Sequence, residues 1–166
     1  MTFVDLVPGD AVFVDANTLI YHFQPHPVLG MPCSDLLRRI ENHELIGFTS
    51  THVLSEVSHR LMTIQASVLL GWPFAGIGNR IRANPAEVRK LTAFRQAVDR
   101  VLQSQLQVLT VLPPLLATAA VLSQQIGLLT NDGLIVALMQ THGLNKIASH
   151  DADFDRAPGL TRYAPA

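Results

Sequence analysis

Acidic side chains that follow apolar runs are the residues of this sequence best suited to do chemistry. The first is Asp15, which directly follows the apolar run 11–14 and precedes Asn17 and Thr18. An unbroken run rich in Val and Phe is typical of a strand buried on both faces at the centre of a parallel sheet. Asp15 is then expected at the carboxyl end of this strand, where open α/β sheets bind ligands, unless it merely ends the strand. Asn17 and Thr18 can orient the carboxylate and cap a following helix.

The second candidate is Glu56, on a helix predicted over about 51–70. The apolar residues of this segment fall on one stripe at helical spacing, and Glu56 is expected beside the stripe, at the boundary between core and solvent. His52 and His59 flank it, which superficially suggests a zinc site. The zinc motif HExxH needs two histidines four positions apart with Glu beside the first, so surface histidines are the better interpretation.

The C-terminal third of the chain supplies the remaining acids. Asp132 precedes 134–139, a segment too apolar for a surface helix, and should lie in the first turn, where the helix dipole favours a negative charge. Capping alone would also explain Asp132. Asp151 and Asp153 follow a short strand predicted over 145–149, so they too are expected after a strand end.

Strands and helices alternate along the chain, which predicts an α/β fold with a mostly parallel sheet of four to five short strands inside helical layers. Strands are expected at about 11–14, 45–49, 107–112 and 145–149, with a last edge strand over 160–163. Helices are expected at about 17–23, 33–43, 51–70, 85–106 and 115–126, and over the apolar segment that follows Asp132. In this arrangement all the candidate acids lie near one edge of the sheet.

Composition favours a single domain over 1–166, with residues 1–10 as a lead-in. Charged residues make up 15% of the chain, against roughly 25% in an average domain, so either the core is large or apolar surface is kept for a partner. No apolar run approaches the roughly 18 to 20 residues of a membrane span, and no signal peptide is recognisable. The single cysteine, Cys33, agrees with a reducing compartment. A cytoplasmic protein without membrane association is therefore expected.

Basic residues are concentrated in the middle of the chain. The net charge is -1, but residues 38–100 hold nine basic against five acidic side chains. Such a segment can face a polyanion such as RNA, although a solvated helix face is the simpler alternative. The residues predicted to contact RNA are Arg80, Arg82, Arg89 and Lys90. Residues 71–84 are expected to form a loop or arm between helices, where Trp72 and Phe74 would suit either base stacking or a protein interface.

Carboxylates brought together at one sheet edge repel one another. No lysine or arginine directly adjoins Asp15, Glu56, Asp132 or Asp151 in the sequence, so a divalent metal is the natural counter-ion. Ligand sets made of oxygen alone favour Mg²⁺ or Mn²⁺ over zinc. Such ions bind phosphate oxygens, generate hydroxide and stabilise an in-line displacement.

Four segments in order resemble the motifs of PIN-domain ribonucleases, most closely the VapC-type toxins of bacterial toxin–antitoxin systems. They are 12–19, 55–57, 131–137 and 148–154. The resemblance implies a three-layer α/β/α PIN-like fold and a metal-dependent endoribonuclease that acts on RNA. It further implies a cognate antitoxin, and a homodimer is the expected assembly. Mild departures from the family pattern are Ser149 in place of threonine, Gly133 in place of alanine, and a longer segment 71–84.

The residues that the resemblance marks as catalytic metal ligands are Asp15, Glu56, Asp132 and Asp151, with Asp153 as a second candidate for the last role. Asn17, Thr18 and Ser149 are predicted to support them.

Two other interpretations come from different classes of protein. A haloacid-dehalogenase-like phosphatase also begins with an apolar strand and an aspartate, but it needs a second aspartate where this chain has Asn17. A catalytically inactive PIN-like scaffold for RNA or protein binding would not need the full set of acids, which this chain retains.

Overall fold

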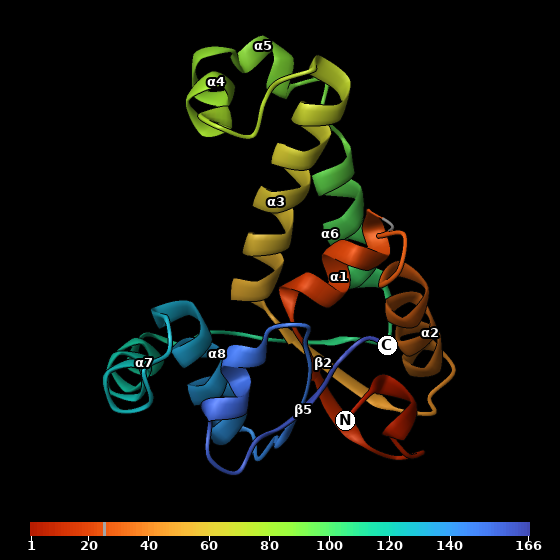
Figure 1. Ribbon diagram of the computed structural model, residues 1–166, viewed down its shortest axis with the longest axis vertical. Helices are drawn as coiled ribbons and strands as arrows, with labels where there is room; N and C mark the ends of the chain where they lie inside the picture. Colours follow the sequence, from red (N-terminus) through yellow and green to blue (C-terminus); the bar gives the residue numbers. More distant parts are fainter. Residues whose placement is uncertain (25) are drawn as a thin grey trace.

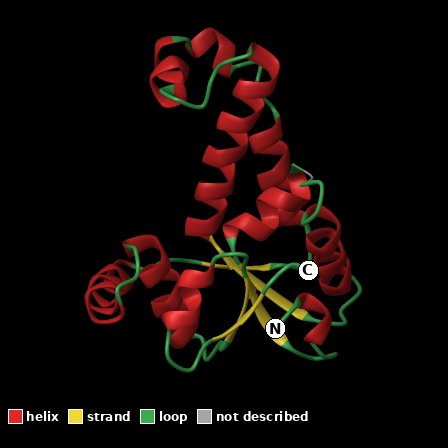
Figure 2. Cartoon of the chain, viewed as in Figure 1, coloured by secondary structure: helices red, strands yellow, loops and turns green. Residues whose placement is uncertain are grey.

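The computed structural model describes residues 1–24 and 26–166 and has a parallel sheet at its centre (Figures 1 and 2). Within these residues the sheet has five strands in the order β3-β2-β1-β4-β5, and every neighbouring pair is parallel. The strands are β1 (Ala11–Val14), β2 (Ile46–Ser50), β3 (Gln107–Leu109), β4 (Lys146–Ala148) and β5 (Thr161–Tyr163). This confirms the predicted α/β class and the parallel sheet.

Strand β1 is the centre of the fold, as its apolar sequence predicts. Val12, Phe13 and Val14 are each fully buried, because helices cover both faces of the sheet there. Phe13 pairs with Phe48 of β2 on one side and with Ile147 of β4 on the other. From β1 the chain adds strands first on one side, as β2 and β3, and then on the other, as β4 and β5. Such a switch point opens a crevice at the carboxyl ends of the strands.

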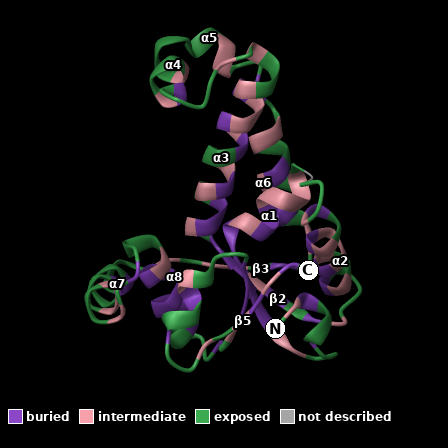
Figure 3. Cartoon of the chain, viewed as in Figure 1, coloured by how far each residue is buried: buried purple, intermediate pink, exposed green. Residues whose placement is uncertain are grey.

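Two groups of helices enclose the sheet (Figure 1). Helices α1, α2, α3 and α6 pack on one another on one side, and the hairpin of α7 and α8 lies on the other. Their bounds are α1 (Ala16–Phe23), α2 (Gly30–Glu41), α3 (Thr51–Leu70), α4 (Ile77–Ala83), α5 (Pro85–Val88), α6 (Ala93–Gln103), α7 (Pro113–Ile126) and α8 (Thr130–Thr141), with short 3₁₀ helices η1 (Phe3–Asp5) and η2 (Ala152–Arg156). Buried residues concentrate around the sheet and the base of α3 (Figure 3).

Helix α3 has the predicted bounds and carries a helical arm at its far end (Figure 1). Ser50 caps its start by accepting a hydrogen bond from the Val53 amide, and Gly71, in the left-handed conformation, ends it. The segment predicted as a loop or arm therefore contains a helix, α4. A second, smaller core of Ala66, Ile77 and Leu91 attaches this arm to α3.

The predicted helix over 85–106 is wrong as a single element. The chain forms α5 and α6 instead, with a turn between them. Gln65 of α3 stabilises this break, because its side-chain oxygen accepts hydrogen bonds from the backbone amides of Thr92 and Ala93, both at 2.9 Å. A contact across 27 residues of sequence thus sets where α6 begins.

The predicted boundary at Pro113 and Pro114 is also shifted. Strand β3 ends at Leu109, and the two prolines open α7 rather than only stopping the strand. Proline is favoured in the first turn of a helix, where its missing N–H would have no partner.

Within the described residues no single helix is long and apolar enough to cross a membrane, while α7 and α8 together, bent by 113°, meet that test by length and composition.

Gly133 sets the close approach of α7 to α8. A Cβ at this position would lie 2.4 Å from Ser123 Oγ and 2.8 Å from the backbone oxygen of Ala119, both on α7. The second of these atoms belongs to the backbone, so α7 itself would have to move to admit a methyl group.

We therefore expect Gly133→Ala to lower the free energy of unfolding by about 1–3 kcal/mol through overpacking. The matched control is Gly78→Ala on α4, where a Cβ meets no atom within 4 Å and the gain in helix propensity should stabilise by up to about 1 kcal/mol. Urea unfolding of both variants measures the difference. Equal stabilities would show that α7 and α8 are not packed as closely as described.

Candidate active site

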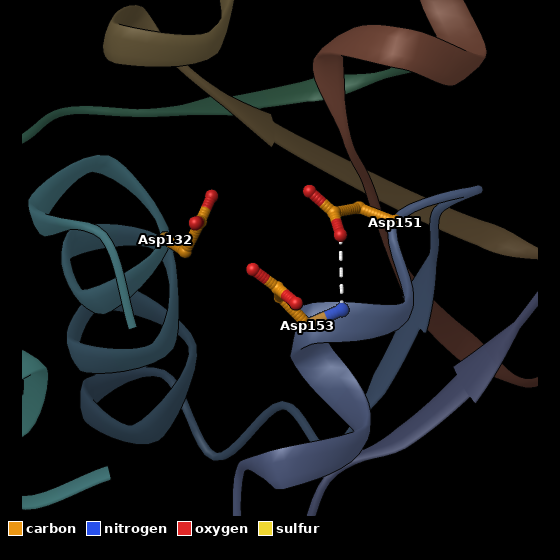
Figure 4. Close-up of side chains that lie close together, drawn as sticks. All are labelled: Asp132, Asp151 and Asp153. Carbon is orange, nitrogen blue, oxygen red and sulfur yellow. Dashed lines mark hydrogen bonds between the residues drawn. The ribbon is translucent and has the colours of Figure 1, made fainter. Parts of the chain in front are cut away.

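The structure brings the predicted acids together at the carboxyl end of the sheet. Asp15 follows β1, Glu56 lies in the second turn of α3, and Asp132 lies in the first turn of α8. Asp151 and Asp153 lie after β4, at the start of η2. Figure 4 shows Asp132, Asp151 and Asp153 pointing toward one another, and each offers a carboxylate oxygen within 4.8 Å of the others.

Asp15 is the most buried of these acids, with 6% of its surface exposed. Its Oδ2 accepts hydrogen bonds from the side-chain amide of Asn17 at 2.6 Å and from the hydroxyl of Ser149 at 2.7 Å. Ser149 Oγ in turn accepts a hydrogen bond from the Asp151 amide, and Asn17 Oδ1 accepts one from the His150 amide. This network fixes Asp15 relative to the loop that carries Asp151.

The expectation that Asn17 and Thr18 cap the helix is wrong. Asp15 itself occupies the N-cap position, so both residues lie inside the first turn of α1. Asn17 holds the Asp15 carboxylate, while the buried Thr18 hydroxyl donates to the backbone oxygen of Ala148 and ties α1 to β4. Of the three predicted supporting residues, Asn17 and Ser149 contact an acid directly.

Burial and mutual repulsion raise the pKa of two acids. Burial is the main cause of the raised pKa of Asp15, about 7, with Glu56 and Asp132 adding to it against the hydrogen bond from Ser149. Burial likewise raises the pKa of Asp132 to about 6, with added repulsion from Asp151, Asp153 and Glu56. Burial and the neighbouring carboxylates thus disfavour the ionised forms of Asp15 and Asp132.

Cationic side chains offset this repulsion only in part. Arg156, three residues after Asp153, pairs with it at 2.9 Å, a neighbour that the sequence analysis did not single out. Among the described residues no ion pair involves Asp15, Glu56, Asp132 or Asp151.

A divalent cation suits the remaining acids. Carboxylate oxygens of Asp132 on α8 and of Asp151 and Asp153 at the start of η2 converge, and hard ions such as Mg²⁺ and Mn²⁺ bind such donor sets. The raised pKa values show that ionised carboxylates are disfavoured without a counter-charge, which a bound cation would supply.

A polar cavity of about 330 Å³ opens beside the acids. Glu56, Asp151 and Asn17 line it together with Arg60 and Tyr21, two residues that the sequence analysis did not select. The sequence does indicate Arg60 in one respect: it lies one helical turn after Glu56, so both residues are on the same face of α3.

The predicted RNA-contacting residues belong to α4 and to the end of α5, the helices of the arm, which Figure 1 shows at the far end of α3 from the sheet. Arg80 and Arg82 are on α4, and Arg89 and Lys90 follow α5. Lys90 pairs with Glu87, which leaves the three arginines as the freer cations of this group. From Glu56 to the end of α3 the helix rises roughly 21 Å, at 1.5 Å per residue.

The model of the PIN domain family matches residues 12–160, which make up most of the chain and include all five candidate acids. This chain belongs to the PIN domain family. It is also similar to the ribonuclease VapC2 of Methanocaldococcus jannaschii, with 26% identity over 153 residues that cover 90% of each chain. A haloacid-dehalogenase-like phosphatase would need an aspartate where this chain has Asn17. Together with the family match, this rules out the phosphatase interpretation.

Solved structures share the fold of this PIN domain at low sequence identity. The sarcin-ricin loop cleaving toxin VapC20 of Mycobacterium tuberculosis superposes with a TM-score of 0.60 at 18% identity, covering 89% of this chain and 95% of that one. VapBC2 of Rickettsia felis, bound to a promoter DNA fragment, gives a TM-score of 0.58 at 16% identity, covering 93% and 98%. The three-layer PIN-like fold predicted from sequence is thereby confirmed.

The raised pKa of Asp15 predicts how stability changes with pH. Folding raises this pKa from 3.8 to about 7, so the folded PIN domain binds more protons than the unfolded chain between these values, and its stability falls as the pH rises through that window. In a chelator, Asp15→Asn should therefore have a higher Tm than wild type at pH 8, by the equivalent of about 4 kcal/mol at most. The difference should disappear near pH 4.

Thermal unfolding at several pH values measures this difference. The matched control is Asp99→Asn, an exposed position on α6, which should show no such pH dependence. A lower Tm for Asp15→Asn at pH 8 would instead mean that the carboxylate is a structural element of the fold.

Proposed function

We propose that this PIN domain is a metal-dependent endoribonuclease that hydrolyses RNA phosphodiester bonds and serves as the toxin of a toxin–antitoxin pair. The observation that carries this proposal is the cluster of partly buried carboxylates at the switch point of the sheet. Similarity to a VapC ribonuclease, and a fold shared with VapC toxins, support the RNA substrate and the toxin role.

Asp15, Glu56, Asp132 and Asp151 would hold Mg²⁺ or Mn²⁺, with Asp153 as an additional ligand candidate beside its partner Arg156. When bound, the ion would supply Lewis acidity toward a phosphate oxygen and lower the pKa of a water molecule. The protein's own contribution is positioning. Hydrogen bonds from Asn17 and Ser149 keep the Asp15 carboxylate in one orientation, so no side-chain rearrangement has to accompany binding.

The basic residues of the arm would hold the RNA backbone away from the reacting phosphate. Arg80, Arg82 and Arg89 are exposed, as residues that bind phosphate have to be. Lys90, already paired with Glu87, would contribute less.

Protein partners belong to the same proposal. The solved structures that share this fold include a toxin–antitoxin complex from Klebsiella pneumoniae, which supports a cognate antitoxin for this chain. Leu112, Leu116 and Val121, in and next to α7, are large apolar side chains exposed to solvent, and a homodimer or an antitoxin would cover such residues. Action on RNA inside the cytoplasm agrees with the single buried thiol of Cys33.

Replacing single acids tests the chemistry. Asp15→Asn, Glu56→Gln and Asp132→Asn should each abolish Mg²⁺- or Mn²⁺-dependent RNA cleavage while the fold stays intact, because the amide keeps the shape of the side chain but removes its charge. Gel-resolved cleavage of RNA, with circular dichroism for the fold, measures both effects. Asp99→Asn should cleave as wild type does. If all three variants cleaved RNA at the wild-type rate, the assignment of these acids to the active site would be wrong.

Neutralising the arm separates RNA positioning from chemistry. In Arg80→Gln/Arg82→Gln, each lost phosphate contact should lower the slope of log affinity against log salt concentration by roughly 0.7, the value for single strands. Metal binding should not change. RNA affinities of the double variant at two salt concentrations measure this, with Arg38→Gln on α2 as the control. An unchanged slope together with altered association would move these arginines to a protein interface.

A further inference from the structure

The polar cavity beside the acids combines features that the metal-binding proposal does not use. Glu56 and Asp151 form its acidic wall, whereas Arg60 and Tyr21 line it from α3 and α1. Its volume of about 330 Å³ is at the small end of ligand sites, roughly 300–1,000 Å³. A ligand of about the size of one nucleotide is therefore the natural occupant.

Arg60 presents a cation to this cavity. It lies one turn after Glu56, so the rigid helix α3 carries both residues on one face. Among the described residues, no carboxylate lies within ion-pair distance of its guanidinium, and the residue is exposed. A guanidinium matches the geometry of a phosphate group and binds it by paired hydrogen bonds.

Tyr21 presents an aromatic ring whose position is fixed by its neighbours. The ring centroid lies 5.2 Å from that of His26 and 6.0 Å from that of His150. His26 Nδ1 accepts hydrogen bonds from the amides of Val28 and Leu29, and the His150 amide donates to Asn17. These bonds hold the His26 ring and the His150 backbone, and the half-buried Tyr21 lines the cavity with an aromatic ring on which a base can stack.

We propose that Arg60 and Tyr21 form a subsite for the nucleotide next to the scissile phosphate, in which the guanidinium binds a phosphate and the ring stacks on the base. This rests on the proposed function. A base paired in a duplex has no face free for an aromatic ring, so the subsite selects RNA that is unpaired at the cleavage point. Glu56 and Asp151 in the same cavity would repel a nucleotide phosphate, and a bound cation would offset this repulsion.

Binding of adenosine 5′-monophosphate and ribose 5-phosphate, measured by isothermal titration in Mg²⁺, separates the two contacts. Neither probe has an internucleotide bond to cleave. Wild type should bind the nucleotide about tenfold more tightly than the sugar phosphate, because only the nucleotide has a base to stack. Tyr21→Leu should abolish this difference and Tyr21→Phe should keep it. Arg60→Gln should weaken both probes by a similar factor, and Arg38→Gln should weaken neither.

Equal affinity of wild type for the two probes would overturn the subsite, and so would unchanged binding in both Arg60→Gln and Tyr21→Leu. Arg60 is exposed, so its variant tests the proposal even where Tyr21→Leu disturbs the fold.

Cleavage of one RNA sequence, presented in a hairpin loop and in a duplex stem, distinguishes the subsite from the proposed function. Wild type should cut the loop at least tenfold faster, and Tyr21→Leu should reduce that ratio. If wild type cuts neither RNA, the proposed ribonuclease function fails, while the titrations still decide the subsite. If wild type cuts both equally, the function stands and the selection for unpaired RNA is refuted.

Discussion

Repulsion among carboxylates held in a partly buried crevice is the constraint on which this structure depends. Burial and neighbouring acids both raise the pKa of Asp15, so the ionised site costs free energy that the rest of the domain must offset. Hydrogen bonds from side chains that are not acidic offset this cost. Asn17 and Ser149 hydrogen-bond the buried carboxylate, and Thr18 ties the following helix to β4. The site is therefore a strained feature on a stable sheet, and a cation is the partner that relieves it.

The topology explains why the acids meet although the sequence separates them widely. Strand β1 lies between β2 and β4, so the elements that leave these three strands diverge around one crevice. Helix α8 brings Asp132 to the same place, and the absence of a side chain at Gly133 lets α7 pack closely behind it. The departure from the family pattern at Gly133 thus has a packing role.

Local signals let the sequence predict a large part of this arrangement. The apolar run before Asp15 predicted the central strand, and the stripe of apolar residues predicted α3 with its observed bounds. Tertiary contacts decided what the sequence could not. Gln65 splits the predicted helix over 85–106 through amides 27 and 28 residues away. Arg60 and Tyr21 come to the site from separate helices, which spacing within one segment does not reveal.

Helix α3 links two parts of the molecule that would act on RNA in different ways. Its base carries Glu56 and Arg60 beside the crevice, and its far end carries the arm with Arg80 and Arg82 (Figure 1). Roughly 21 Å of helix lies between them. An RNA held at both ends must therefore extend several nucleotides beyond the scissile phosphate. If the proposed function holds, shorter RNA would reach the acids but gain nothing from the arm, so affinity for RNA should rise with its length whereas the chemistry at the acids should not.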